Sequence, residues 1–149
     1  MFFIGLTLFL VSQSAATPAT QPAMKGSVEA SVQNPRTKKW RQGSTAEPGE
    51  YIRYKINYVN TGKTPVVGFV LRNAVPEGTR LIEKAEGKGC KLEYSIDRGS
   101  TFSAKPLKRA EGKEVEADPE EYTHLRCTQT EPQLKPGETI GAVYTVQLK

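Results

Sequence analysis

The chain has very few of the side chains on which metal sites and nucleophilic sites depend. Its 149 residues include a single histidine and two cysteines, and these fall into no zinc-ligand spacing, catalytic triad or C-x-x-C motif. The glycine-rich phosphate loops G-x-x-x-x-G-K and G-x-G-x-x-G are missing as well. These absences argue against an enzyme that uses a metal, a nucleophilic side chain or a nucleotide, and we expect no cofactor.

Long apolar runs and helical periodicity are also lacking. The longest apolar run, Phe2 to Val11, is well short of the roughly 20 residues that a membrane-spanning helix needs, so no transmembrane segment is expected. No stripe with a period of 3.6 residues competes with the strand patterns described below. The composition, 37% hydrophobic and 25% charged, is ordinary for one globular domain.

The first residues are typical of a secretory signal peptide. The apolar run Phe2 to Val11 is followed by the small and polar residues Ser12 to Ala16, the order in which an apolar core precedes a cleavage site. We expect cleavage after Ala16, with Ala19 as the second choice. A core strand or buried helix is the alternative, disfavoured by the Thr/Pro/Ala/Gln linker that follows. The expected organisation is a signal peptide at 1–16, a flexible linker at 17–26 and one domain at 27–149, exported to the periplasm, the extracellular space or the cell surface.

Alternation of apolar and polar residues predicts β-strands, most clearly between Pro48 and Gly78. Four apolar side chains alternate with charged and polar ones, as in a half-buried strand: Ile52, Tyr54, Ile56 and Tyr58. The polar turn Asn60 to Pro65 should then reverse the chain. The next run, Val66 to Leu71, is apolar on both faces, which favours a hairpin partner in the interior of a sheet.

Further strands are predicted by the same periodicity at Val28–Val32, Thr79–Glu83, Cys90–Ile96, Tyr122–Thr128 and Ile140–Leu148, with a turn at Glu86–Gly89. In the fourth of these, Leu125 and Cys127 should share one face and Tyr122 the other. The polar segment Ala104–Glu121 is expected to be a long excursion with one brief strand, anchored by Leu107 and Val115. About seven or eight strands at this spacing predict an all-β sandwich.

Several of these motifs together resemble a known family. PGE-Y-x-x-Y, N-x-G and V-P-E-G lie within 48–78, and YSIDRGSTF, EEYTHLR and LKPGETIGAVYTVQLK follow them. The chain is similar, over about 27–149, to the conserved-repeat domain of bacterial surface and envelope proteins called domain of unknown function eleven, in its small exported single-domain form. The resemblance implies an immunoglobulin-like β-sandwich. Asn73 replaces the family's usual acidic residue, which weakens the case for a carboxylate ion site, and Cys127 stands where a tryptophan is usual.

The two cysteines are expected to form a disulfide. Cys90 and Cys127 each fall on the apolar phase of their strand, and an exported protein folds in an oxidising compartment. Two unpaired buried cysteines, acting as small apolar side chains, are the alternative.

A basic segment surrounds the only tryptophan: Arg36, Lys38, Lys39, Trp40 and Arg41. A planar aromatic ring between cations can contact an anionic polymer, but the same residues are typical of an exposed edge strand that resists pairing. The net charge is +5, yet acidic residues are interspersed throughout. A nucleic-acid binder usually concentrates its cations on one element, so nucleic acid is not expected as a partner.

The sequence therefore favours a non-enzymatic exported envelope protein, a structural or binding β-sandwich whose partners are envelope or cell-surface components or copies of itself. The alternative is a subunit of an extracellular filament or surface assembly joined by β-strand addition. An enzyme or metal carrier is a third hypothesis. Its candidates are His124 and five carboxylates that fit a solvated loop better than paired acid and base catalysts: Glu114, Glu116, Asp118, Glu120 and Glu121.

Overall fold

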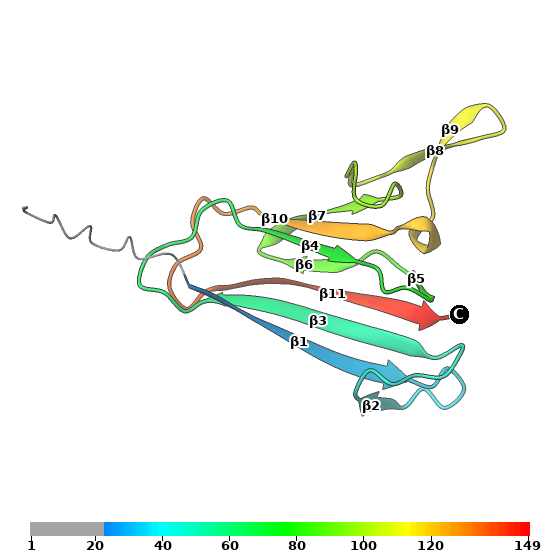
Figure 1. Cartoon of the computed structure of the whole chain (residues 1–149), viewed down its shortest axis with the longest axis horizontal. Helices are drawn as coiled ribbons and strands as arrows, with labels where there is room; N and C mark the ends of the chain where they lie inside the picture. Colours follow the sequence, from blue (N-terminus) through cyan, green and yellow to red (C-terminus); the bar gives the residue numbers. More distant parts are fainter. Residues whose placement is uncertain (1–22) are drawn as a thin grey trace, which may run out of the picture.

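The computed structural model describes residues 23–149, so the predicted signal peptide and most of the linker lie outside the described residues. Apart from one turn of 3-10 helix, the regular elements of the described residues are all strands, and two antiparallel sheets pack face to face (Figure 1). The prediction of an all-β sandwich is confirmed. The strands are β1 (Met24–Gln33), β2 (Trp40–Gln42), β3 (Tyr51–Asn60), β4 (Val70–Ala74), β5 (Thr79–Leu81), β6 (Glu86–Lys88), β7 (Cys90–Ser95), β8 (Leu107–Ala110), β9 (Lys113–Glu116), β10 (His124–Gln129) and β11 (Thr139–Leu148).

The larger sheet has the strand order β2-β1-β3-β11-β5, and β6 also pairs with β11. Its three long strands form one layer of the sandwich in Figure 1. β1 pairs with β3 along its whole length, and it starts at Met24, three residues before the expected domain boundary. Glu86–Lys88, predicted as part of a turn, forms β6 because it lies alongside Gly141–Val143 of β11.

The second layer is a three-stranded sheet with the order β4-β10-β7. The predicted hairpin of β3 and β4 is wrong, because the polar loop carries the chain from one sheet to the other. The prediction that Val66–Leu71 is an interior strand is wrong too: β4 starts only at Val70 and lies at the edge. Gly68, with φ at +69°, interrupts the apolar run, so Val67 is 70% exposed.

The core lies between the sheets and follows the predicted strand phases. β3 contributes Ile52 and Ile56, and β11 contributes alternate residues from Ile140 to Val146. Tyr54 of β3 and Tyr144 of β11 pack with ring centroids 5.4 Å apart. Burial of these side chains is the main force that holds the layers together.

A buried asparagine fixes the loop that crosses between the sheets. Asn60 is 1% exposed, and its Nδ2 donates to the carbonyl oxygens of Thr64 at 2.8 Å and Leu134 at 2.9 Å. Its Oδ1 accepts from the backbone N–H of Gly62 at 3.0 Å. The side chain therefore replaces the backbone bonds that the loop cannot form with itself.

The polar excursion 104–121 differs from expectation in two ways. It forms a two-stranded hairpin, β8 with β9, which projects from the sandwich in Figure 1. Leu107 is 56% and Val115 38% exposed, so neither is an anchor. Ala117 and Tyr122 are buried instead, and the Tyr122 ring stacks on Tyr94 at 4.5 Å.

Tyr122 was expected on the face opposite Leu125, but both side chains are buried. The reason is local. A turn of 3-10 helix occupies Pro119–Glu121, and β10 starts only at His124. Tyr122 therefore lies before the strand, where the alternation of faces does not apply.

Candidate functional site

The two cysteines are joined. Cys90 of β7 and Cys127 of β10 form a disulfide with their Cα atoms 5.3 Å apart, which confirms the sequence-based pairing. The strands are neighbours in the sheet, and Cys127 is fully buried. The bond therefore links two adjacent strands inside the core, and nothing in its position indicates a redox role.

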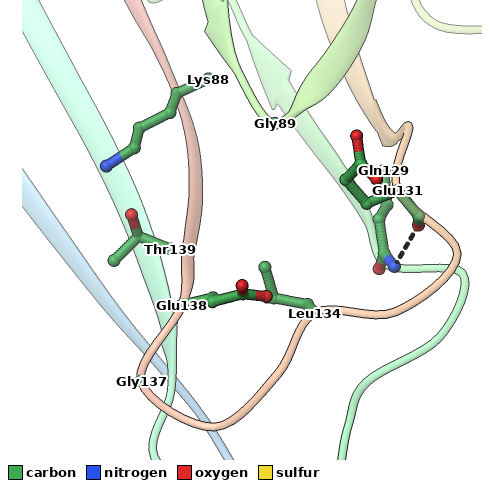
Figure 2. Close-up of a pocket in the computed structure, with 8 residues that line it drawn as sticks. All are labelled: Lys88, Gly89, Gln129, Glu131, Leu134, Gly137, Glu138 and Thr139. Carbon is green, nitrogen blue, oxygen red and sulfur yellow. Dashed lines mark hydrogen bonds between the residues drawn. The ribbon is translucent and has the colours of Figure 1, made fainter.

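An open hollow of about 390 Å³ lies beside the disulfide, lined by Lys88, Gly89, Gln129, Glu131, Leu134, Gly137, Glu138 and Thr139 (Figure 2). The side-chain amide of Gln129, one of the lining residues, already forms hydrogen bonds within the protein. Gln129 Nε2 donates to the carbonyl oxygen of Glu131 at 2.7 Å, and Gln129 Oε1 accepts from the N–H of Phe69 at 3.0 Å. The amide thus holds the start of β4 against the end of β10, and we assign this hollow a structural role.

A larger hollow of 630 Å³ contains His124, Glu120 and Glu121, together with the turn Pro76–Thr79. Four of the five candidate carboxylates at or near it are ion-paired: Glu120 with Arg80, Glu121 and Asp118 with Lys108, and Glu116 with Lys84. These lysines lower the pKa of Glu121 and Glu116. A general acid needs a raised pKa, so the electrostatics of this cluster oppose that role.

The basic segment lies at the edge of the larger sheet. Asn34 Oδ1 accepts the backbone N–H groups of Arg36 at 2.9 Å and Thr37 at 3.2 Å, and so shapes the turn that precedes β2. β2 then pairs with the end of β1. The Arg53 guanidinium lies 4.1 Å from the centroid of the Trp40 ring, which occupies one face of the ring.

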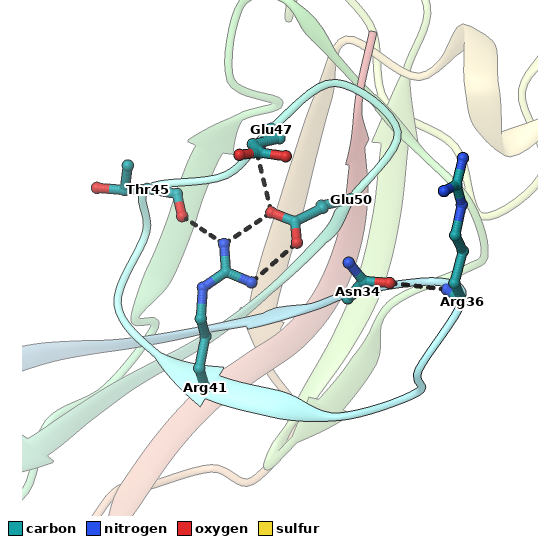
Figure 3. A network of polar contacts seen from close by, with 6 residues as sticks. All are labelled: Asn34, Arg36, Arg41, Thr45, Glu47 and Glu50. Carbon is teal, nitrogen blue, oxygen red and sulfur yellow. Dashed lines mark hydrogen bonds and ion pairs between the residues drawn. The ribbon is translucent and has the colours of Figure 1, made fainter.

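The side chain of Arg41, although 49% exposed, points toward the buried Glu50 (Figure 3). Its two terminal nitrogens lie 2.9 and 2.7 Å from the two carboxylate oxygens, and it also donates to the Thr45 carbonyl. These bonds to Arg41, with one from the N–H of Glu47, lower the Glu50 pKa to about 2. Of the five residues proposed for anion contact, Arg36, Lys38 and Lys39 are exposed to solvent. Arg41 instead holds the loop before β3 through Glu50.

The two sheets also present unpaired strand edges. β4 pairs with β10 on one side only, and β1 pairs on its outer side with β2 over no more than Ser31–Gln33. Three valines stand near these edges: Val28, Val67 and Val70, with exposures of 63, 70 and 44%. Sequence periodicity placed Val28 in a strand. It could not show that β2, the strand on the outer side of β1, would be too short to pair with Val28.

Within residues 23–149 no group of three or more His, Cys, Asp or Glu side chains is arranged to hold a metal ion. No helix in that range is long and apolar enough to cross a membrane. Comparison with protein-family models gave no match, and comparisons with curated proteins and with solved structures gave none either. The resemblance to a family of envelope domains accordingly stays a prediction from the residues.

Proposed function

We propose that the chain is a non-enzymatic exported protein of a bacterial envelope, a β-sandwich that binds or connects other envelope components. The disulfide is the observation that supports this most directly. Cys127 is completely buried, and bonds of this kind form and persist in oxidising compartments such as the periplasm and the cell surface. The apolar start of the chain supports the same destination.

The arrangement of charges supports a binding or structural role over catalysis. Four of the five carboxylates that might have served as acid and base are held in ion pairs with lysine or arginine: Glu116, Asp118, Glu120 and Glu121. His124 Nδ1 lies 3.1 Å from the hydroxyl of its neighbour Thr123, in an open hollow. The exposed cations Arg36, Lys38 and Lys39 offer an anionic envelope polymer a point of contact.

Export is tested on the natively started chain produced in a bacterium. We expect the protein in the periplasmic or extracellular fraction, with an intact mass that begins at Thr17 and is two hydrogens below that of the reduced chain. The variant Ala16→Glu, which removes the small residue at the cleavage site, should keep its leader. A cytosolic chain that still begins at Met1 and holds two free thiols would contradict the proposal.

A second candidate function is a subunit of a filament or surface assembly built by β-strand addition. The unpaired edges of β1 and β4 favour it, because an exposed edge can receive a strand from another chain. Val28–Val32 is an unsuitable donor, since it belongs to a strand that pairs with β3 along its whole length. The remaining candidate donor, Phe2–Val11, lies outside the described residues. A ladder of oligomers in size-exclusion chromatography of the native protein would support this function, and a species of fixed size would contradict it.

A further inference from the structure

Within residues 23–149, no strand pairs with the outer edge of β1 over its first half. Hydrogen-bonded and non-bonded pairs alternate along an antiparallel ladder. The Thr61 N–H donates to the Ala23 carbonyl at 2.8 Å, so the odd-numbered residues of β1 bond to β3. The N–H and C=O groups of Met24, Gly26 and Val28 therefore point outward. The bond from the Gly43 N–H to the Ala30 carbonyl confirms this direction and closes the edge from Ala30 onward.

The side chains at this edge form a small apolar surface on the inner face of the sheet. Val28 lies opposite the buried Ile56 in the register, yet it is 63% exposed because the three-stranded sheet does not extend over it. The Tyr58 ring covers Gly26 so closely that a Cβ there would lie 2.7 Å from it. Tyr58 in turn packs on Phe69, with centroids 5.2 Å apart.

The β1 edge is complementary to the same edge of a second copy. Antiparallel pairing with a second copy must match outward-pointing residues with outward-pointing residues, which is satisfied when the two-fold axis lies at any one residue of the segment. An axis at Lys25 would pair Val28 with residue 22, outside the described residues, and an axis at Val28 would pair Gly26 with Ala30, whose carbonyl already accepts from Gly43. Gly26 and Ser27 remain. An axis at Ser27 would bring Met24 against Ala30 of the second copy, a position that its own Gly43 already occupies. An axis at Gly26 avoids this collision and leaves each β2 beyond the end of the paired segment.

We propose that two copies of this chain associate through their β1 edges, about a two-fold axis at Gly26, to form one continuous sheet. Met24 then lies opposite Val28 of the second copy, and the two glycines meet beneath their Tyr58 rings. On the outer face Lys25 lies opposite Ser27 of the second copy and diagonal to both Glu29 and Lys25 of that copy, so each lysine can pair with a glutamate across the axis although the two lysines are also neighbours. Association covers the exposed valine and satisfies the free backbone groups.

The other free edge is a poorer match to itself. The outward groups of β4 belong to Val70, Arg72 and Ala74, because the N–H of Gln129 bonds the Phe69 carbonyl and the N–H of Val75 bonds the Thr123 carbonyl. A two-fold axis at the middle of β4 would place Arg72 beside its own copy, and like charges in that position repel. The self-complementary edge is therefore β1. A two-fold contact of this kind closes on itself and yields a dimer.

Association is tested first with the purified full chain, and the test does not depend on export. A small interface is weak, so sedimentation velocity should show a dimer at concentrations on the order of 100 µM. Val28→Lys should raise the dissociation constant about tenfold or more, because it places a charge on the apolar surface. Val67→Lys, the same change at an exposed valine that precedes β4, should leave it within about twofold.

The thermal midpoints of both variants, measured by circular dichroism, separate loss of pairing from loss of folding, since both valines are exposed. A chain that stays monomeric at millimolar concentration would overturn the proposal, even if another segment of the chain then pairs with the β1 edge. So would a dimer that Val28→Lys leaves intact, or one that Val67→Lys disrupts.

A charge exchange tests the register. Lys25→Glu and Glu29→Lys, each alone, bring like charges together across the axis and should weaken the dimer about fivefold at low salt. The double variant restores opposite charges and should return the dissociation constant to within about twofold of the original. A double variant weaker than both single ones would rule out pairing about Gly26.

Discussion

At the scale of single residues, Glu50 shows how a buried charge is accommodated. Its side chain is 7% exposed, and the Arg41 guanidinium binds both of its carboxylate oxygens. Burial alone would raise the pKa, but the bonds to Arg41 and to the N–H of Glu47 outweigh it, and the pKa falls to about 2. Because the charged form is stabilised only in the folded protein, Glu50 links stability to pH.

The sign of that link follows from the direction of the shift. A carboxyl with a folded pKa of about 2 and an unfolded value near 4.5 contributes stability above the unfolded value, and the contribution is lost as the pH falls through the folded one. We expect the unfolding free energy, measured by urea titration, to fall between pH 5 and pH 2 by less in Glu50→Gln than in the wild type. Arg41→Ala should flatten the profile in the same way. Profiles parallel to the wild type would contradict the assignment.

The sequence could not have identified this pair. Arg41 belongs to a run of cations that fits anion contact and an exposed edge equally well, and Glu50 stands nine residues later in the loop before β3. Only the fold of that loop brings the two together. Residue type and periodicity therefore predicted where the cations lie in the chain, but not that one of them, Arg41, binds a buried carboxylate of the same protein.

At the scale of elements, the strand phases were predictable because a single face of each strand is buried. Cys90 and Cys127 fell on the apolar phase and are joined. What the phases could not give is which strands pair. A polar loop after an apolar strand fits a hairpin as well as a crossing between sheets, and the crossing of β3 to β4 depends on contacts with the distant loop at Leu134.

The disulfide should contribute measurably to stability. It closes a loop with a sequence separation of 37 residues, and the chain-entropy model gives about 3–4 kcal/mol for a loop of this size. We expect the double variant Cys90→Ala/Cys127→Ala to lose about this much unfolding free energy in urea. The wild type with reductant should lose about as much, and reductant should leave the variant unchanged. Equal stability of the oxidised and reduced wild type would show that the strands are held by packing alone.

At the scale of the whole molecule, the sandwich is uneven. A three-stranded sheet covers a wider one, so the core is complete over β11 and the end of β1, where Val32 is fully buried, but not at Val28. The sequence predicted β1 from its alternation and could not predict that its first half would lack a covering layer. The same imbalance explains why the exposed valine and the free edge occur together.

Truncation should show which part of the start of the chain belongs to the fold. A chain that begins at Ala23 keeps every described strand, and we expect it to unfold cooperatively with a thermal midpoint close to that of the longer protein. A chain that begins at Pro35 loses β1, and with it the ladder along β3 and the buried Val32. Removing the long partner strand of β3 exposes apolar surface on it, so this shorter chain should be unfolded or aggregated. Circular dichroism melts of the two chains make the comparison, and a cooperative melt of the shorter one would mean that β1 is an accessory to the sandwich, free to leave it and pair elsewhere.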